Sequence, residues 1–384
     1  MINKLLYFIL LSLLFLAGCI EQYYTELKNI ESILVVEGFI TSGTTQITLS
    51  RSVSLDVNSS NDFIAVDHAF VYVACDDGTQ SEVSRSSGNG TYLITTGELK
   101  MDTKYCLVIQ VEDHEYWSDF LSLPYTTPSM NISFACDDND IHVCINSYGN
   151  DTQTGYYLWS YKEDWEIYSY MYGPWVFNEI VTSWNQLRYV RVANDLNSPN
   201  NRYYCWRRDS SRFYIMGTTD HLTDNNIREK KILSFSRTNE KTSVLYRVQV
   251  TQNRIHKEGY DYYSSVQKNM FQTGSIFSHI PYEITGNIKC ITNPDIPVIG
   301  YVEVSTTITD VQWLDTIFFD PSYRNSQRCG YEDLMPDPGY GATAPGQGLV
   351  LFSQEPLYVT EHCVDCTKRS GTKRKPKDWP NDHI

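Results

Sequence analysis

The stretch Phe70-Val71-Tyr72-Val73-Ala74-Cys75-Asp76-Asp77-Gly78 decides the predicted fold, because a short apolar run leads directly into a turn. Branched and aromatic residues favour strands, whereas Asp and Gly favour turns. The pattern recurs at Ile33–Val36 before Gly38, at Tyr92–Ile94, and at Tyr105–Val111, where apolar residues alternate. Strands of about five residues between turns predict a mainly β chain that begins with an immunoglobulin- or transthyretin-like sandwich over residues 33–126.

A larger β domain with one main helix is predicted over residues 129–366, after a linker that contains Pro124 and Pro128. Tyr246, Val248 and Val250 alternate with polar residues, which indicates a half-buried strand. The helix is expected over residues 254–270, with Tyr260, Tyr263 and Val266 on its inner face. Residues 320–348 are rich in Pro and Gly and are predicted to form one long loop.

Residues 1–18 have the order of a lipoprotein signal peptide. A basic start precedes an apolar run that ends at Leu16-Ala17-Gly18-Cys19 and is too short to span a membrane. This ending resembles the bacterial lipobox, so Cys19 is the predicted site of lipid attachment, and residues 19–32 form a tether. The alternative is an ordinary signal peptide with a chance cysteine after the cleavage site. The lipid would anchor the chain to a membrane without spanning it.

The charge balance limits the classes of partner. The chain carries 46 acidic and 31 basic residues and a net charge of −15, which argues against nucleic acid, whose phosphates require a positive surface. A basic C-terminal tail over residues 367–384 is the local exception, and its Lys and Arg side chains are expected to be solvated.

Ten cysteines indicate an oxidising compartment. With Cys19 lipidated, the other nine leave at least one thiol without a disulfide partner inside the chain. Cys136 and Cys144 are equidistant from residue 140, so a hairpin turn centred there predicts a disulfide between them. Cys363 and Cys366 allow zinc binding, redox chemistry or structural disulfides. Disulfides that pin the tail, with Cys205 as one partner, are the favoured interpretation, because further zinc ligands and a helical setting are lacking.

Two aromatic segments follow each other in the chain. Alternation in a strand places Tyr157, Trp159, Tyr161, Glu163 and Trp165 on one face, which is predicted to be the core. The adjacent run over residues 168–175 has no clean period, and it is predicted to be an exposed loop that binds a ligand or partner. The residues of this candidate surface are Tyr168, Tyr170, Tyr172 and Trp175.

The sequence has no recognisable catalytic constellation. Glu163 and Glu166 are three positions apart, so in a strand they point to opposite faces and cannot flank one substrate. The eight histidines form no helical ligand pair, and Asp137–Asp140 lack the glycine and glutamate of an EF-hand. We therefore expect no cofactor, no metal site and no enzymatic activity.

Several segments resemble the Bacteroidota lipoproteins grouped as domain of unknown function 4249. They lie in the order of that family and cover most of the chain: Leu34–Gly38, Tyr156–Trp159, Glu163–Glu166, Tyr246–Val250, Thr273–Phe277, Gly286–Ile288, Asn293–Pro294, Val298–Tyr301, Cys363–Thr367 and Trp379–Pro380. Lys368-Arg369-Ser370 departs from the family, which often has apolar residues and a glycine there.

The resemblance implies an outer-membrane lipoprotein, and members of the family are often encoded beside a TonB-dependent receptor. Glu21 after the lipidated cysteine is similar to surface-export signals, so cell-surface exposure is expected over a periplasmic orientation. The expected function is a non-catalytic accessory that captures a ligand or gates its entry for a TonB-dependent transporter. The alternatives are a scaffold of outer-membrane assembly or secretion machinery and an uncharacterised hydrolase.

Overall fold

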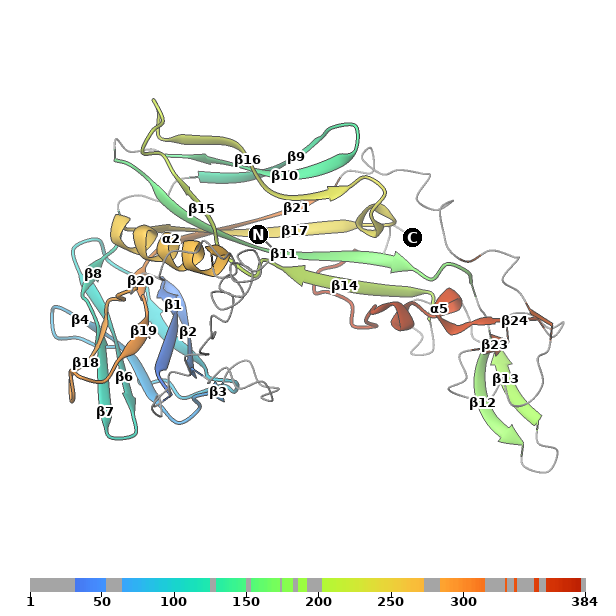
Figure 1. Ribbon diagram of the computed structural model, residues 1–384, viewed down its shortest axis with the longest axis horizontal. Helices are drawn as coiled ribbons and strands as arrows, with labels where there is room; N and C mark the ends of the chain where they lie inside the picture. Colours follow the sequence, from blue (N-terminus) through green and yellow to red (C-terminus); the bar gives the residue numbers. More distant parts are fainter. Residues whose placement is uncertain are drawn as a thin grey trace, which may run out of the picture.

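The computed structural model confirms a mainly β protein with one main helix (Figure 1). It describes residues 32–52, 64–124, 129–149, 153–172, 175–181, 186–191, 202–272, 284–314, 329, 335–336, 349–351 and 357–380. The signal peptide, Cys19, almost all of the tether and most of the 320–348 loop lie outside these residues. Within them, no helix has both the length and the apolar character needed to cross a membrane.

Two sheets form the N-terminal sandwich. One has the order β19-β1-β2-β3, with β20 beside β1 and β5 beside β2. Its strands are β1 (Leu34–Ile40), β2 (Gly43–Arg51), β3 (Ile64–Ala65), β5 (Thr91–Gly97), β19 (Val298–Gly300) and β20 (Glu303–Val304). The other has the order β18-β7-β6-β4, with β8 beside β6. Its strands are β4 (Phe70–Cys75), β6 (Lys104–Val111), β7 (His114–Ser118), β8 (Leu121–Ser122) and β18 (Ile288–Cys290).

Alternate residues of β1 contribute to the core of this sandwich. Leu34, Val36 and Ile40 of β1 are buried against residues of the second sheet such as Val71 and Ile109. The intervening residues of β1 face the other way, toward the second half of the molecule. The strand therefore has one face in the core and one face available to another element.

Residues 288–304 return to this sandwich from far along the chain. β19 and β20 pair in parallel with β1, and β18 pairs with β7. The sequence-based boundaries placed this segment inside the larger domain at 129–366, because local patterns do not show which distant strand a segment pairs with. Parallel pairing needs a long crossover, which here includes both the other sandwich strands β2–β8 and most of the second domain.

A five-stranded sheet and a three-stranded sheet form the second domain. The first has the order β14-β11-β17-β21, with β15 beside β11, and the second has the order β16-β10-β9. The strands are β9 (Ser129–Cys136), β10 (Asp140–Tyr148), β11 (Tyr156–Tyr168), β14 (Tyr204–Ser210), β15 (Ile215–Thr218), β16 (Asn226–Ser236), β17 (Tyr246–Ile255) and β21 (Thr306–Trp313). Their inner faces share one core, in which Tyr157, Trp159 and Trp165 are buried as predicted.

The main helix, α2 (Lys257–Gln272), lies between the second domain and the N-terminal sandwich (Figure 1). It begins directly after β17, close to the predicted range of 254–270. Tyr263 and Val266 of its predicted inner face line a cleft against the sandwich, and Tyr260 packs on Tyr156 with ring centroids 5.4 Å apart.

The predicted disulfide between Cys136 and Cys144 is wrong. Cys136 pairs with Ile141 and Cys144 pairs with Ser133, so the turn is centred between residues 138 and 139 rather than at residue 140. Asp137 fixes this turn, because its Oδ1 accepts hydrogen bonds from the backbone N–H of Asn139 and Asp140. Both cysteines are free, one exposed and one buried.

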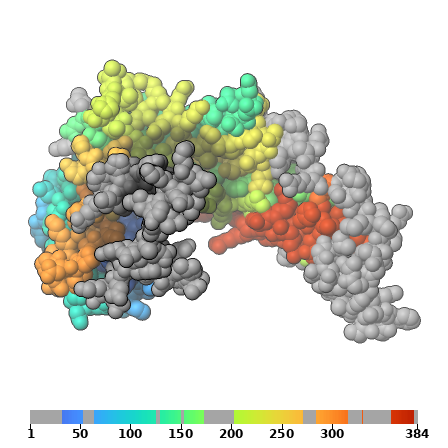
Figure 2. Space-filling model, in the orientation of Figure 1, coloured from blue at the N-terminus to red at the C-terminus, as the bar shows by residue number. Residues whose placement is uncertain are grey.

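The C-terminal segment is held to the end of the second domain far from β18–β20, as the red and orange residues of Figure 2 show. Cys366 forms a disulfide with Cys205, and Cys363 forms one with Cys329. Each cysteine of the Cys-x-x-Cys motif thus pins the segment through a different partner. The smaller elements at this end are β12 (Trp175–Val181), β13 (Gln186–Arg191), η1 (Glu240–Thr242), β22 (Met335–Pro336), β23 (Leu349–Leu351), β24 (Leu357–Thr360), α5 (Glu361–Val364) and η4 (Cys366–Arg369).

Beyond the disulfides, the predicted basic tail packs on the sheet. Thr372 exchanges two backbone hydrogen bonds with Trp206 and so covers part of the β14 edge. Trp379 is 5% exposed and packs on Trp313. The expectation of a solvated tail is wrong for Arg369, whose guanidinium lies 3.8 Å from the ring centroid of Tyr170. Covering an edge strand in this way removes a site of unwanted pairing.

Candidate ligand-binding cleft

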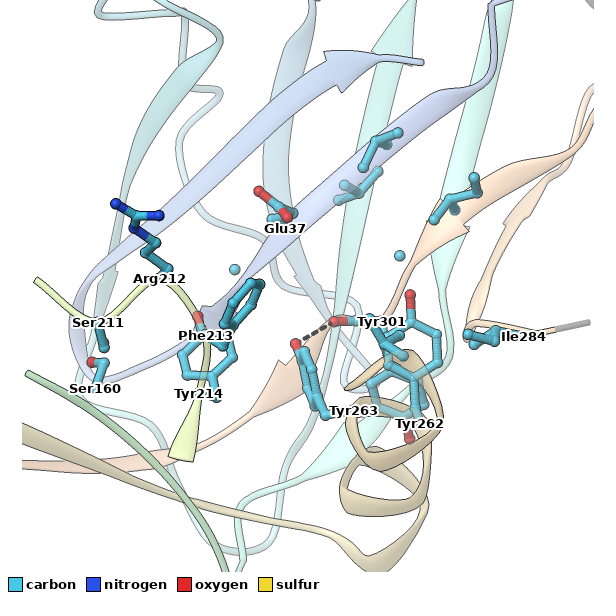
Figure 3. Close-up of a pocket in the computed structure, with 16 residues that line it drawn as sticks. Glu37, Ser160, Ser211, Arg212, Phe213, Tyr214, Tyr262, Tyr263, Ile284 and Tyr301 are labelled. Carbon is cyan, nitrogen blue, oxygen red and sulfur yellow. Dashed lines mark hydrogen bonds between the residues drawn. The ribbon is translucent and has the colours of Figure 1, made fainter. Parts of the chain in front are cut away.

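A cleft of about 660 Å³ separates the N-terminal sandwich from the second domain (Figure 3). One wall is the outer face of β1 together with residues 299–301. The other wall is made by α2 and by the 211–214 segment that precedes β15. This volume is within the range of small-molecule sites, which commonly form between domains.

The β1 wall follows from the alternation of its sequence. Leu34 and Val36 point into the sandwich core, so Val35, Glu37 and Phe39 point toward the second domain. Glu37 is the polar residue of an otherwise apolar strand, and it lines the cleft. The same alternation that builds the core therefore delivers a carboxylate to the cleft.

Two glycines let the backbone of this wall approach its neighbours closely. Gly38 has a φ of +141°, and a Cβ there would lie 2.4 Å from the carbonyl oxygen of Gln46. Gly300 has a φ of +145°, and a Cβ there would lie 2.3 Å from the carbonyl oxygen of Val36. Any larger residue would push β1 away from a neighbouring strand, so both positions require glycine.

Aromatic rings from distant segments pack together between the two walls. Tyr214 lies edge-on to Phe39 at 5.5 Å, and Tyr263 contacts both rings at 6.0 and 5.5 Å. Tyr262 continues the series to Tyr301 at 5.2 Å. Rings that pack on one another lose little further freedom when a ligand arrives, so this surface is preorganised.

The hydroxyl groups of these tyrosines stay protonated. Burial raises the pKa of Tyr214 to about 12, and it raises the pKa of Tyr262, Tyr263 and Tyr301 as well. The charge of Glu37 adds to the effect at Tyr214, Tyr262 and Tyr263. Tyr263 donates its hydrogen bond to the backbone oxygen of Tyr301 at 3.1 Å (Figure 3). The tyrosines are thus neutral rings and hydrogen-bonding groups rather than acids or bases.

A buried pair fastens α2 to the sandwich behind the cleft. His256 Nδ1 lies 2.5 Å from Glu303 Oε1 of β20, and the Glu303 side chain is fully buried. Burial by itself lowers the pKa of His256, but the hydrogen bond and charge of Glu303 outweigh this and raise it overall. Burial raises the pKa of Glu303, and the contacts with His256 offset only part of that shift. Gly259 leaves room for Glu303, since a Cβ there would lie 2.2 Å from Oε2.

The model of the family called domain of unknown function (DUF4249) matches residues 20–310 of this chain. The chain belongs to the DUF4249 family. The match covers both walls of the cleft and ends before the C-terminal segment. No curated protein matches the chain.

In this DUF4249 chain, the predicted binding surface at residues 168–175 does not line the cleft. Tyr168 stacks on Tyr203 with ring centroids 5.2 Å apart, and Tyr172 meets the same ring edge-on. Tyr170 lies under Arg369. These rings join β11 to the C-terminal segment. Trp175 begins β12, and its side chain lies outside the described residues.

Glu163 and Glu166 lie on opposite faces of β11, as the spacing predicts. Glu163 pairs with Lys241 at 2.5 Å and accepts a hydrogen bond from Tyr246 at 2.8 Å. Glu166 accepts a hydrogen bond from Trp379 Nε1 at 2.9 Å on the other side. Each carboxylate is buried with a structural partner, so the two acids do not converge on a substrate.

One cluster of potential metal ligands is present among the described residues. Cys329, Cys363 and His362 place their ligand atoms within 4.8 Å of one another. The two sulfurs are bonded to each other, so they lack the thiolate charge that zinc requires. In this oxidised form the Cys329–Cys363 disulfide joins the C-terminal segment to residue 329.

Sequence reasoning found Tyr263 and Val266 through the period of the helix, but it missed Glu37, Arg212, Tyr214 and Tyr301. The carboxylate at position 37 within an apolar strand was the one available signal. The others were not recognisable, because the 211–214 segment has no regular period and the contact of Tyr301 with α2 depends on the parallel return to β1.

Proposed function

We propose that this protein is a lipid-anchored outer-membrane lipoprotein that acts as a non-catalytic accessory to a TonB-dependent transporter. In this proposal the lipid on Cys19 holds the chain at the outer membrane, facing the cell surface. The interdomain cleft captures a ligand and presents it to the transporter. The lipobox and the family membership support the location, and the preorganised tyrosine-lined cleft is the observation that carries the binding function.

The composition of the cleft supports binding over catalysis. Its titratable side chains are Glu37, Arg212 and tyrosines, and the described lining includes no histidine, cysteine or lysine. A hydrolase needs a nucleophile and a base within hydrogen-bonding reach, or two convergent acids. Neutral tyrosines beside one carboxylate suit recognition of a ligand by stacking and hydrogen bonds.

The test is a pull-down of the tagged full-length protein from its own outer membrane in mild detergent, followed by mass spectrometry. We expect a TonB-dependent barrel in stoichiometric amount. Recovery of assembly or secretion components would instead favour the scaffold, and recovery of the lipoprotein alone would remove the transporter from the proposal.

Two variants sharpen this experiment. Cys19→Ala should release the protein from membranes, and a variant that still floats with lipid would refute the anchor. Tyr262→Ala alters the cleft and should still recover the barrel, because the proposed docking does not use the cleft. Loss of the barrel in this variant would mean that the cleft contacts the transporter rather than a ligand.

A further inference from the structure

The lining of the cleft contains two side chains of opposite charge. Glu37 on β1 and Arg212 before β15 are the charged residues of its lining. Neither forms an ion pair with any described residue, and they do not pair with each other. Both side chains are exposed at the cleft, so each is open to a charged group of a ligand.

Figure 3 shows how the two charges lie. Arg212 and Glu37 come from opposite walls and lie apart from each other, both near Phe213. The tyrosine rings of α2 and residue 301 lie farther along the cleft, beside Ile284. A ligand that spans the cleft therefore meets a guanidinium, a carboxylate and an apolar aromatic surface.

The surroundings of each charge select the group that it binds. The carboxylate of Glu37 attracts a cation, so it suits the ammonium group of a ligand, while the tyrosine rings farther along the cleft suit an apolar body. The guanidinium of Arg212 offers paired donors, which match the two oxygens of a carboxylate. A ligand with a single charge would satisfy only one of these two side chains.

We infer that the cleft binds a zwitterion with an aromatic or other apolar body, its ammonium at Glu37 and its carboxylate at Arg212. Amino acids and short peptides with free ends are the chemical class with this arrangement. The inference rests on the proposed ligand-capture function and names the ligand class for the same site. It assigns Glu37 and Arg212 as the residues that determine specificity.

The experiment compares four probes that share one phenyl body: phenylalanine, phenethylamine, phenylacetate and benzyl alcohol. Their dissociation constants for the complete mature chain are measured by calorimetry or ligand-observed NMR. We expect phenylalanine to bind at least about tenfold more tightly than either singly charged probe, and benzyl alcohol to bind most weakly.

Two variants assign the charges. Glu37→Gln should remove the advantage of phenethylamine over benzyl alcohol and leave phenylacetate unchanged. Arg212→Gln should have the opposite pattern. Glu82→Gln and Arg374→Gln remove an exposed charge of the same sign outside the cleft and should change no affinity.

Each other outcome overturns the inference in a defined way. Equal binding of benzyl alcohol and phenylalanine would show that the charges are not used. Phenethylamine binding as tightly as phenylalanine would indicate a cation site, and binding of no probe would exclude this ligand class. None of these results changes the pull-down, so failure here is distinguishable from failure of the transporter proposal.

Discussion

The aromatic face of β11 and the tyrosine wall of the cleft are built from the same residue types, but their polar atoms differ. In β11, Trp159 Nε1 donates to Gln252 at 2.7 Å, and Trp165 Nε1 donates to Glu240 at 3.1 Å. In the cleft, the hydroxyls of Tyr262 and Tyr301 have no hydrogen-bond partner among the described residues. An aromatic residue whose polar group is hydrogen-bonded within the protein stabilises the fold. A polar group without such a bond at a cavity is available to a ligand.

Among the variants that test this difference between core and cleft, Trp159→Ala should have the largest effect on the free energy of unfolding. The side chain is fully buried and packs on Gly217, where a Cβ would lie 2.6 Å from the ring. We expect the free energy of unfolding to fall by about 3–5 kcal/mol in urea denaturation. Phe213→Ala in the cleft, at a side chain that is 44% exposed, should change it by less than about 0.5 kcal/mol. Similar losses in both variants would contradict the division between core and cleft.

Loss of the Cys205–Cys366 disulfide, which lies in the core of the second domain, should have the next largest effect on the free energy of unfolding. Both cysteines are fully buried there. Replacing both with Ala should lower the free energy of unfolding by about 2–5 kcal/mol, measured against the oxidised wild type. Cys136→Ala removes an exposed free thiol and is the control. A double variant as stable as the control would show that the disulfide does not hold the tail.

Removing a single hydroxyl from each region gives the most direct test. Tyr246 donates a buried hydrogen bond to Glu163, so Tyr246→Phe should lower the free energy of unfolding by about 1.5–3 kcal/mol. Tyr262→Phe should change it by less than about 0.5 kcal/mol, because the hydroxyl has no hydrogen-bond partner among the described residues. Tyr262→Phe should instead weaken phenylalanine binding. Equal destabilisation by the two variants would mean that the cleft hydroxyl is structural.

The smallest effect is a pH dependence of stability from the pair behind the cleft. The pKa values of both His256 and Glu303 are raised, from 6.5 and 4.5, so the folded state binds these protons more tightly than the unfolded state. The contribution of these two protons to the free energy of unfolding is fully present below pH 4.5. It decreases as the pH rises through the raised pKa values, and the His256 part is lost above pH 6.5.

His256→Gln should remove the part of this slope above pH 6.5, as measured by urea denaturation across pH. His221→Gln is the matched control, because that side chain is 92% exposed. An unchanged slope in His256→Gln would place the pH dependence elsewhere in the chain.

Local sequence determined the strands, the main helix and the buried face of β11. Alternation with period two and helical spacing depend only on neighbouring residues, so they can be read directly. The sequence also predicted that Cys363 and Cys366 form disulfides, because the segment lacks the additional ligands that a zinc site needs. The predicted disulfide between Cys136 and Cys144 was wrong, because it assumed a turn centred at residue 140. Hydrogen bonds to the side chain of Asp137 place the turn earlier, and spacing alone does not show them.

Only the tertiary structure decided where the cleft lies. The cleft exists because residues 288–304 cross back to pair with β1 and place Tyr301 beside α2. The burial of His256 and Glu303 against each other depends on the same return. Contacts between segments more than 200 residues apart leave no periodic signal in either segment. The sequence by itself therefore determined what each strand buries, and long-range pairing determined which exposed faces meet.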